Sequence, residues 1–240
     1  MRIATWNLER PSVRSWRKLP CQLEQIAAIN ADVWILTETR ASIQPSAEHC
    51  YVVHAPPHSD RRPDEDERWV SIWSRFPLED AGIEASPRGT VAAVVDSPLG
   101  HLALYGTVVP WHSEPSPDGV VRPWSVHAIE LQRQAGEWRN LASRFAGVCV
   151  VGDFNQSWQG RGYGTRALRA THHDAAQGAG LVCLTAGEVS DGLPVIDHVL
   201  LSRVWVDRFS ARVAATWPGR RDDGTRMSDH AGVAVDIDEN

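Results

Sequence analysis

Short runs of apolar and β-branched residues recur along the whole chain, and each has the length of a β-strand. We expect strands at 2–6, 33–37, 51–54, 69–73, 90–95, 102–109, 148–151, 198–201 and 232–235. Three other segments, at 19–29, 125–145 and 166–178, carry apolar residues at helical spacing. Strands that outnumber helices about three to one disfavour a strict strand-helix alternation and favour two packed sheets with helices outside.

The polar stretches between these segments each begin close to the end of an expected strand. They cover 56–68, 110–123, 156–165 and 218–227. None of them divides the chain as a linker would, so we expect residues 1–240 to form a single domain with these stretches as loops. Loops at strand ends commonly carry function.

Composition narrows the class of protein. The 240 residues are 42% hydrophobic and 22% charged, which is ordinary globular usage. The longest apolar runs stop far short of the roughly 18 residues that a membrane span needs, and the N-terminus lacks an apolar signal core. We therefore expect a soluble, cytoplasmic protein without a membrane span. The net charge of −6 argues against indiscriminate polyanion binding, although a single cleft can still be locally basic.

Two residue types exclude several kinds of site. Cys21, Cys50, Cys149 and Cys183 lie far apart without a CxxC pair, so we expect buried thiols and neither a disulfide framework nor a zinc site. The only lysine, Lys18, lies outside any Gly-rich loop, which excludes a Walker-type phosphate loop and a lysine Schiff base.

Five short polar motifs stand at or just past the ends of apolar runs. They are TWN at 5–7, TETR at 37–40, GDFN at 152–155, IDHVLLS at 196–202 and SDH at 228–230. Asn7 and Glu38 offer oxygen ligands of the kind that Mg²⁺ prefers. Asp153 can take a proton and Asn155 can donate a hydrogen bond, so a water nucleophile and its base are available.

The last motif places a carboxylate, Asp229, directly before the imidazole of His230. Asp197 can hold that imidazole from a neighbouring strand, as carboxylates do in other hydrolases. Each motif alone is weak, because an acid at a strand end is more often a helix cap or a turn residue. The five motifs are informative about function only as a set, through their order and their spread along the chain.

In that order, the motifs WN, ETR, GDFN, IDH with VLLS, and SDH resemble the endonuclease/exonuclease/phosphatase family. Its members include deoxyribonuclease I-like nucleases, abasic-site endonucleases, sphingomyelinases and inositol-polyphosphate phosphatases. The resemblance covers essentially the whole chain, and it is specific for the superfamily but not for one member. It implies an α/β fold, a four-layer sandwich of two central mixed β-sheets flanked by helices, with a cleft between the sheets.

The resemblance also implies a Mg²⁺ site, in which Mn²⁺ can substitute. Asn7 and Glu38 look like its ligands, with Asp229 as an additional one. Glu9 matches a place where some members carry an acidic second ligand, although a solvated residue after the strand fits it equally well.

The catalytic roles follow from the same resemblance. Asp153 looks like the residue that orients or deprotonates the attacking water, with Asn155 as its hydrogen-bonding neighbour. His230 looks like the phosphate-contacting imidazole of the family, and Asp197 looks like the carboxylate that orients it.

The sequence departs from the family on one strand. Family nucleases usually present a tyrosine or histidine just before a proline, where it contacts the scissile phosphate, whereas here Thr107 or Val108 falls near that place, before Pro110. Either the role is vacant or His112 fills it from the loop, and a solvated histidine is the plainer interpretation. The gap counts more against a vigorous general DNase than against a phosphodiesterase.

The loop after GDFN holds the residues that we expect to contact substrate. Arg161 and Arg166 suit phosphate oxygens, and Trp158, with Tyr163 nearby, can stack on bases. The alternative is a Gly-rich turn whose aromatics cover the core. Most tryptophans should be core residues, and Trp111 joins Trp158 as the only expected contacts among them. The stretch 56–68 is net acidic, and 219–226 should be a solvated, internally paired face.

These features favour a Mg²⁺-dependent phosphodiesterase that uses in-line attack of water, with nucleic acid slightly preferred as its substrate. Hydrolysis of a small phosphoester or a lipid headgroup remains open, as does a catalytically idle binding protein. A Ser-His-Asp esterase is a further alternative, weakened because GxSxG is absent and Ser228 lacks a strand-turn-helix setting. No obligate protein partner is evident.

Overall fold

The computed structural model describes residues 1–12, 14–57, 65–86 and 89–240. Several charges of the expected acidic loop at 56–68, namely Asp60, Arg61, Arg62 and Asp64, lie outside the described residues.

Two mixed sheets of six strands each form the centre of the molecule. The first sheet has the order β13 (Phe209–Trp217), β14 (Gly232–Glu239), β1 (Arg2–Asn7), β2 (Val33–Arg40), β4 (Glu67–Ser74) and β3 (Tyr51–His54). The second has the order β5 (Leu78–Asp80), β6 (Thr90–Ser97), β7 (Gly100–Val108), β8 (Val148–Asp153), β12 (Asp197–Ser202) and β9 (Leu181–Cys183). Each sheet has one parallel pair, β1 with β2 and β7 with β8.

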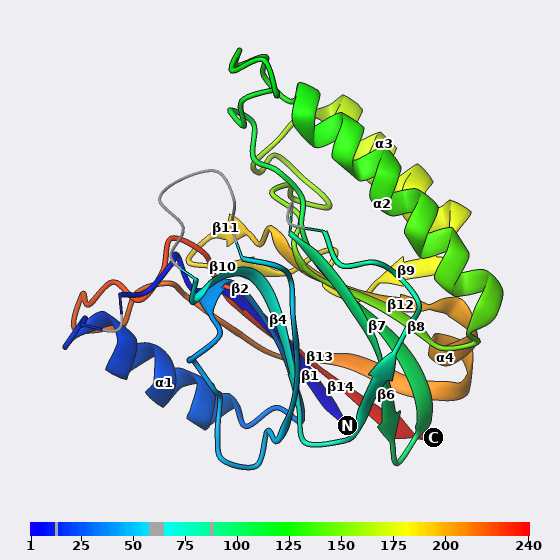
Figure 1. The fold of residues 1–240 in the computed structure, drawn as a ribbon, viewed down its shortest axis with the longest axis horizontal. Coiled ribbons are helices and arrows are strands. Elements are labelled where there is room, and N and C mark those ends of the chain that lie inside the picture. Colours follow the sequence, from blue (N-terminus) through cyan, green and yellow to red (C-terminus); the bar gives the residue numbers. More distant parts are fainter. Residues whose placement is uncertain (13, 58–64, 87–88) are drawn as a thin grey trace.

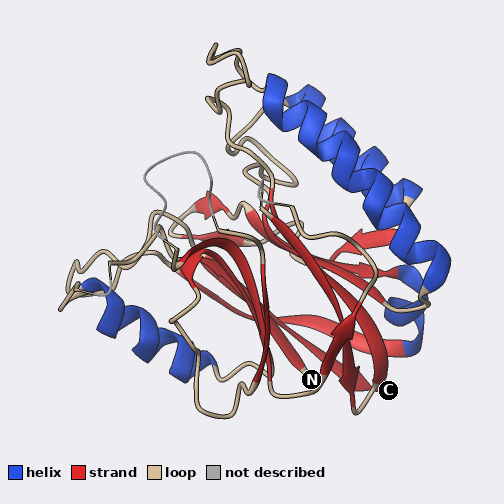
Figure 2. Cartoon of the chain, in the orientation of Figure 1, coloured by secondary structure: helices blue, strands red, loops and turns tan. Residues whose placement is uncertain are grey.

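Helices cover the outer faces of both sheets (Figures 1 and 2). Helix α1 (Lys18–Ile29) packs on the first sheet, and α2 (Ser125–Arg144) and α3 (Arg166–Gly178) pack on the second. A short helix, α4 (Arg203–Arg208), follows β12, and a small hairpin joins β10 (Val189–Ser190) to β11 (Leu193–Pro194). The expected four-layer α/β sandwich is therefore confirmed.

Alternation along each strand divides the apolar side chains between the layers. On β2, Val33 and Ile35 face the second sheet, whereas Trp34 and Leu36 face α1. The strands read as continuous apolar runs because both faces of each sheet are covered. The inter-sheet core brings the ends of strands from different sheets close together.

The three expected helices are present with nearly the expected bounds, but several strands were not expected. The longest of these is β13, a strand at the edge of the first sheet with many half-buried side chains. Its polar and small residues dilute the apolar signal that marks buried strands. Strands β2 and β8 also run further than expected, so that Glu38 and Asp153 lie within them.

The cysteine prediction is confirmed only in part. All four thiols are free, but only Cys149 is fully buried, and Cys50 is exposed. Most tryptophans are buried, as expected, while Trp16 and Trp111 are exposed. Within the described residues, no helix combines the length and the apolar character needed to cross a membrane.

Candidate active site

Strand ends from both sheets meet at one edge of the sandwich. Asn7 ends β1 and pairs with Thr37 of the parallel strand β2, which places Glu38 beside it. In the second sheet, Asp197 at the start of β12 lies opposite Asp153 at the end of the antiparallel strand β8. Because β1 packs against β8 and β12, the polar ends of all four strands converge.

Asp153 lies at the centre of this convergence and is fully buried. Its Oδ1 accepts a hydrogen bond from the Asn155 backbone N–H at 2.7 Å, and its Oδ2 accepts from Asn155 Nδ2 and Asn7 Nδ2, both at 3.0 Å. Gly152 permits this placement, because a β-carbon there would lie 2.0 Å from the backbone oxygen of Thr107. The GDFN sequence thus brings β8 unusually close to β7 just before the acid.

His230 lies between two carboxylates. Its Nδ1 donates to Asp197 Oδ2 at 2.7 Å, and its Nε2 is 3.9 Å from Asp153 Oδ2. Ser228 fixes the segment, because its hydroxyl donates to the backbone oxygen of Asn7 at 2.6 Å and accepts from the His230 N–H at 3.1 Å. The SDH motif is therefore tied directly to the end of β1.

Burial and neighbouring charge shift the pKa values of these groups. Burial of the His230 ring opposes its protonation, but the carboxylates of Asp153 and Asp197 outweigh this and raise its pKa to about 10. Burial raises the pKa of both carboxyls, while the His230 charge counteracts that rise. The imidazole is thus a cation at neutral pH, and Asp153 is a stronger base than an exposed aspartate.

Glu38 and Asn155 both adopt left-handed backbone conformations, with φ of 43° and 46°. Such conformations cost on the order of 1–3 kcal/mol in a non-glycine residue and gather at functional sites. Glu38 Oε2 pairs with Arg10 Nε at 3.2 Å, and burial is the main cause of the raised pKa of its carboxyl. Arg10, three residues past the WN motif, is a site residue that the motifs do not predict, because the chemistry expected of that segment rested on Asn7 and Glu9 as metal ligands.

The carboxylates of Glu38 and Asp153 suit a hard cation. Asn7 Nδ2 donates to both, at 3.3 Å to Glu38 Oε1 and 3.0 Å to Asp153 Oδ2, so the two acids approach one point. The negative charge of Asp153 also raises the pKa of Glu38, so positive charge placed between the two carboxylates would offset their repulsion. Ligand atoms of Asp153, Asp197 and His230 also lie within 4.8 Å of one another, but His230 there is engaged with Asp197.

Three of the residues expected at the metal site have other partners in the structure. The side-chain oxygen of Asn7 accepts from the Glu9 backbone N–H at 2.8 Å, so its amide nitrogen, not the oxygen, faces the carboxylates. Glu9 itself is paired with Lys18 and Arg226. Asp229 is 52% exposed and lies 3.9 Å from Arg226, outside the group formed by Asp153, Asp197 and His230.

The expected substrate contacts also separate into two groups. Trp158 is only 6% exposed and packs against Phe154 and His198, so its expected stacking role is wrong and it belongs to the core. Arg161 and Arg166 are exposed, as a phosphate contact requires. His112 lies in the loop after β7, half-buried among aromatic rings.

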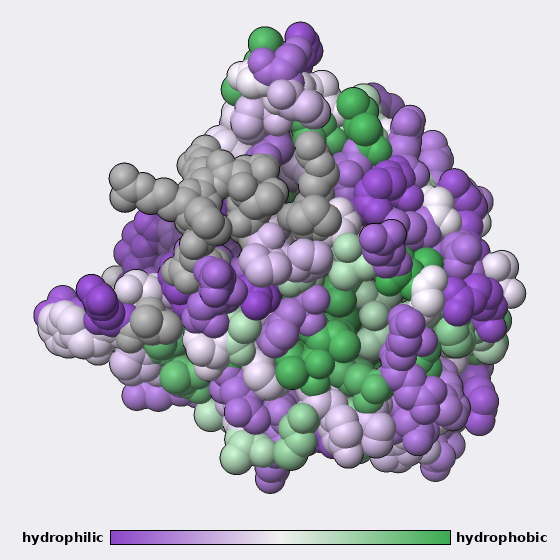
Figure 3. All heavy atoms as spheres, in the orientation of Figure 1, coloured by the Kyte–Doolittle hydropathy of each residue, from purple (hydrophilic) through white to green (hydrophobic). Residues whose placement is uncertain are grey.

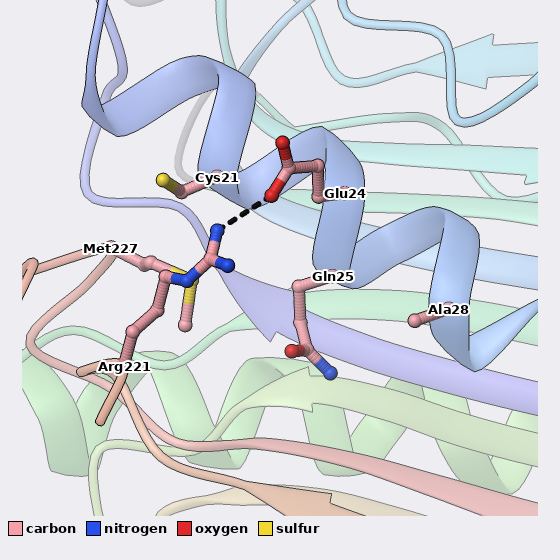
Figure 4. Close-up of a pocket in the computed structure, with 6 residues that line it drawn as sticks. All are labelled: Cys21, Glu24, Gln25, Ala28, Arg221 and Met227. Atoms are coloured by element: carbon pink, nitrogen blue, oxygen red, sulfur yellow. Dashed lines mark hydrogen bonds and ion pairs between the residues drawn. The ribbon is translucent and has the colours of Figure 1, made fainter. Parts of the chain in front are cut away.

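The loop at 218–227 is paired less internally than expected. Arg221 Nη1 reaches across to Glu24 Oε2 of α1 at 2.6 Å, and the two side chains border a pocket between the loop and the helix (Figure 4). This pocket is lined by Cys21, Glu24, Gln25, Ala28, Arg221 and Met227, none of which belongs to the site around Asp153.

Comparisons with known proteins agree with this arrangement. The model of the endonuclease/exonuclease/phosphatase family matches residues 4–230. No curated protein matches the sequence. Among solved structures, the fold is similar to the 3′ phosphatase NExo from Neisseria bound to a product DNA hairpin, at 20% identity and a TM-score of 0.69, over 99% of this chain and 99% of that one.

Two further structures show the range of proteins with this fold. An AP endonuclease from Archaeoglobus fulgidus has 15% identity and a TM-score of 0.66, over 99% of this chain and 99% of its own. Sphingomyelinase C from Streptomyces griseocarneus has 16% identity and a TM-score of 0.60, over 100% of this chain and 99% of its own.

We predict that Asp197→Asn lowers the pKa of His230 from about 10 toward its ordinary value near 6.5, because the substitution removes the carboxylate bonded to Nδ1. The protonated His230 ring should stabilise the fold fully at pH values below its unfolded-state pKa, and this stabilisation should be lost as pH rises through its folded-state pKa. Because the folded-state pKa is lower in the variant, the variant should lose the stabilisation at a lower pH. NMR titration of the ring protons in metal-free protein measures the shift.

Asp229→Asn is the matched control for this titration. It removes an equal charge from a half-exposed side chain, so its effect on the pKa of His230 should be smaller. A His230 pKa that is the same in Asp197→Asn and in the parent would contradict the assignment.

Proposed function

The chain belongs to the endonuclease/exonuclease/phosphatase family, and from this membership we propose that it is a divalent-metal-dependent phosphodiesterase with nucleic acid as its preferred substrate class. The observation that carries the proposal is the buried arrangement of His230 between Asp153 and Asp197. It combines a base and a cation at one edge of the sheets, as hydrolysis of an anionic ester requires.

Asp153 is the proposed base. Its raised pKa suits proton transfer near neutral pH, and the N–H groups of Asn155 and Asn7 fix its orientation. As the oxygen of the attacking water forms its bond to phosphorus, the water gives a proton to Asp153. The ester oxygen on the opposite side leaves with the electron pair of the broken bond and takes a proton from solvent. Asn155, held by the backbone oxygen of Val109 at 3.0 Å, keeps the carboxylate in place.

His230 is the proposed stabiliser of phosphate charge. Because its pKa is about 10, the ring is protonated at neutral pH, and its Nε2–H remains close to Asp153 while Nδ1 is held by Asp197. A cation fixed in advance stabilises charge that develops on the phosphate oxygens without having to reorient. Asp197 is a positioning residue in this scheme.

Glu38 would hold the divalent metal together with Asn7, whose amide must rotate to present its oxygen. Mg²⁺ suits the oxygen donors, and Mn²⁺ is a substitute. Such an ion would neutralise phosphate charge and make the phosphorus more electrophilic. Burial already disfavours the ionised Glu38 carboxyl, so a bound cation would lower its pKa.

Two alternatives are less well supported. A serine esterase would need the Ser228 hydroxyl beside the imidazole nitrogens, but that hydroxyl bonds to backbone groups and Nδ1 of His230 is taken by Asp197. Hydrolysis of a small phosphoester or lipid headgroup uses the same chemistry. Nucleic acid is preferred because Arg161 and Arg166 are exposed past β8, and because a solved structure with this fold is described as bound to DNA.

We expect Glu38→Ala to weaken Mg²⁺ or Mn²⁺ binding at least about 10-fold, because it removes the carboxylate that faces Asn7 and Asp153. Isothermal titration calorimetry of parent and variant measures the change. Asp229→Asn is the matched acidic control and should leave the affinity within about twofold, on the scale expected of an exposed charge. Unchanged affinity in Glu38→Ala would remove this residue from the metal site.

We expect Asp153→Asn and His230→Ala each to lower turnover of a phosphodiester at least about 100-fold with the fold retained, on the usual scale for a positioned base or a charge-stabilising group. Asp197→Asn alone should cost less, and it should add little to His230→Ala because it acts through that ring. Steady-state rates on plasmid DNA, abasic oligonucleotide, RNA and bis-p-nitrophenyl phosphate, with Mg²⁺ and with chelator, provide the measurement. Full additivity in the double variant would show that Asp197 and His230 act separately.

The substrate class is tested by the salt dependence of binding. If the substrate is an extended nucleic acid, replacing Arg161 and Arg166 by alanine should weaken binding and flatten the salt slope by roughly 0.7–0.9 for each phosphate that the variant no longer neutralises. The pair Arg203→Ala and Arg208→Ala on α4 changes net charge equally and should leave the slope as it is. Binding is measured on Asp153→Asn protein, and no affinity for DNA or RNA at low salt would favour a small phosphoester.

A further inference from the structure

Two loops leave the site side by side and carry aromatic residues into solvent. The first, at 109–124, joins β7 to α2, and the second, at 154–165, joins β8 to α3. They are bonded to each other at their roots, where Val109 N–H donates to the backbone oxygen of Asp153 at 2.8 Å and Asn155 Nδ2 donates to the oxygen of Val109 at 3.0 Å. Both loops that carry these rings therefore begin next to Asp153, the proposed base.

Four rings from the two loops form what we call the aromatic cluster: Trp111, His112, Trp124 and Tyr163. His112 is central, with ring centroids 5.2 Å from Trp111, 5.7 Å from Trp124 and 6.4 Å from Tyr163. Trp124 and Tyr163 are 5.5 Å apart, and the Tyr163 hydroxyl lies 3.3 Å from His112 Nδ1. The contacts join rings from both loops into one surface.

This cluster is not part of the core. Trp111 is 47% exposed and Tyr163 is 40% exposed, whereas Trp158 on the second loop is buried in the layer under α3. Most ring pairs in the cluster are edge-to-face. In each such pair one ring touches its neighbour only through its edge, so this contact does not cover its flat faces. The first loop projects beyond the sandwich in Figure 1, and the same projection stands clear of the body of the molecule in the space-filling view (Figure 3).

Hydrogen bonds fix Tyr163 to the segment that directly follows Asp153. Ser157, four residues past Asp153, donates its backbone N–H and its hydroxyl to the backbone oxygen of Tyr163 at 3.0 and 2.9 Å. The exposed Arg161 is two residues before Tyr163 in the chain.

We propose that the aromatic cluster is a stacking subsite for an unpaired nucleobase next to the phosphate held at Asp153 and His230. The inference rests on the proposed function and narrows its substrate to strands whose bases are free to leave a duplex. Flat aromatic faces accept any base, and Arg161 on the second loop together with Arg166 at the start of α3 favours the anionic backbone that links successive bases. The same arginines oppose the cationic headgroup that aromatic cages bind.

The test is equilibrium binding at low salt with chelator present, so that no strand is hydrolysed. Two fluorescent strands of equal length are compared, an oligodeoxyadenylate and a strand of base-free tetrahydrofuran residues. Stacking of one base lowers Kd by about 5- to 150-fold, so the parent should bind the oligodeoxyadenylate more tightly by a factor in that range.

Trp111→Ala and Tyr163→Ala should each remove most of this preference and leave binding of the base-free strand unchanged. Trp16→Ala is the matched control, because Trp16 is 76% exposed and lies before α1. Equal binding of the two strands by the parent, or equal losses on both strands in the variants, would overturn the subsite. Phosphocholine competition that depends on Trp111, without a base preference, would overturn it in favour of a cationic headgroup.

Failure of the subsite and failure of the proposed function give different results. A base preference that depends on Trp111 and Tyr163, in a protein that hydrolyses no strand with Mg²⁺ or Mn²⁺, would leave the subsite standing and contradict the phosphodiesterase. Hydrolysis of both strands at equal efficiency, with no base preference in binding, would support the phosphodiesterase and contradict the subsite.

Discussion

The buried charge at His230 is the interaction on which the site depends. Removing an imidazolium and two carboxylates from water is costly, and the cost is offset only when the groups are paired and hydrogen-bonded. His230 meets this condition through Asp197 on one side and Asp153 on the other. Asp153 in turn accepts hydrogen bonds from Asn155 and Asn7, whereas Asp197 Oδ1 has no partner among the described residues. Moving any one of these strand ends would leave a buried charge without its partner.

The sheet topology supplies that geometry at little local cost. Parallel pairing aligns the ends of β1 and β2 and the ends of β7 and β8, while the antiparallel strand β12 begins where β8 ends. The remaining adjustment is made by the backbone, in the close approach of Gly152 to Thr107 and the left-handed conformations of Glu38 and Asn155. Conformations of this kind persist only where surrounding structure holds them. The rigid core between the sheets thus stabilises the strained ends.

Much of the fold could be predicted from sequence because buried strands and amphipathic helices leave strong periodic signals. Strand β13 could not, since an edge strand with half-buried, small and polar residues resembles a loop. The order of the motifs also predicted which residues lie close together at the site, but not how their side chains are oriented. Asn7 directs its nitrogen to the carboxylates because the Glu9 N–H occupies its oxygen, and Asp229 points to Arg226 although it is adjacent to His230. Trp158 and Trp111 look equivalent in the sequence, and only packing distinguishes the buried ring from the exposed one.

The hydrogen bonds of Asn7 indicate how cation binding at the proposed metal site would be coupled to the protonation of its carboxyls. Its amide nitrogen donates to the half-buried carboxyl of Glu38 and the fully buried carboxyl of Asp153. The raised pKa values of both reflect burial and, for Glu38, the proximity of Asp153. A partially positive N–H group between two acids stabilises their ionised forms weakly, and a divalent ion in the same place would stabilise them strongly. An ion bound by Glu38 would lower the pKa of both carboxyls, and it would compete with His230 for the negative charge of Asp153. Proton affinity at His230 would then fall as the ion binds, so the strength of the base, the charge of the imidazole and cation binding are set by one shared group of carboxylates.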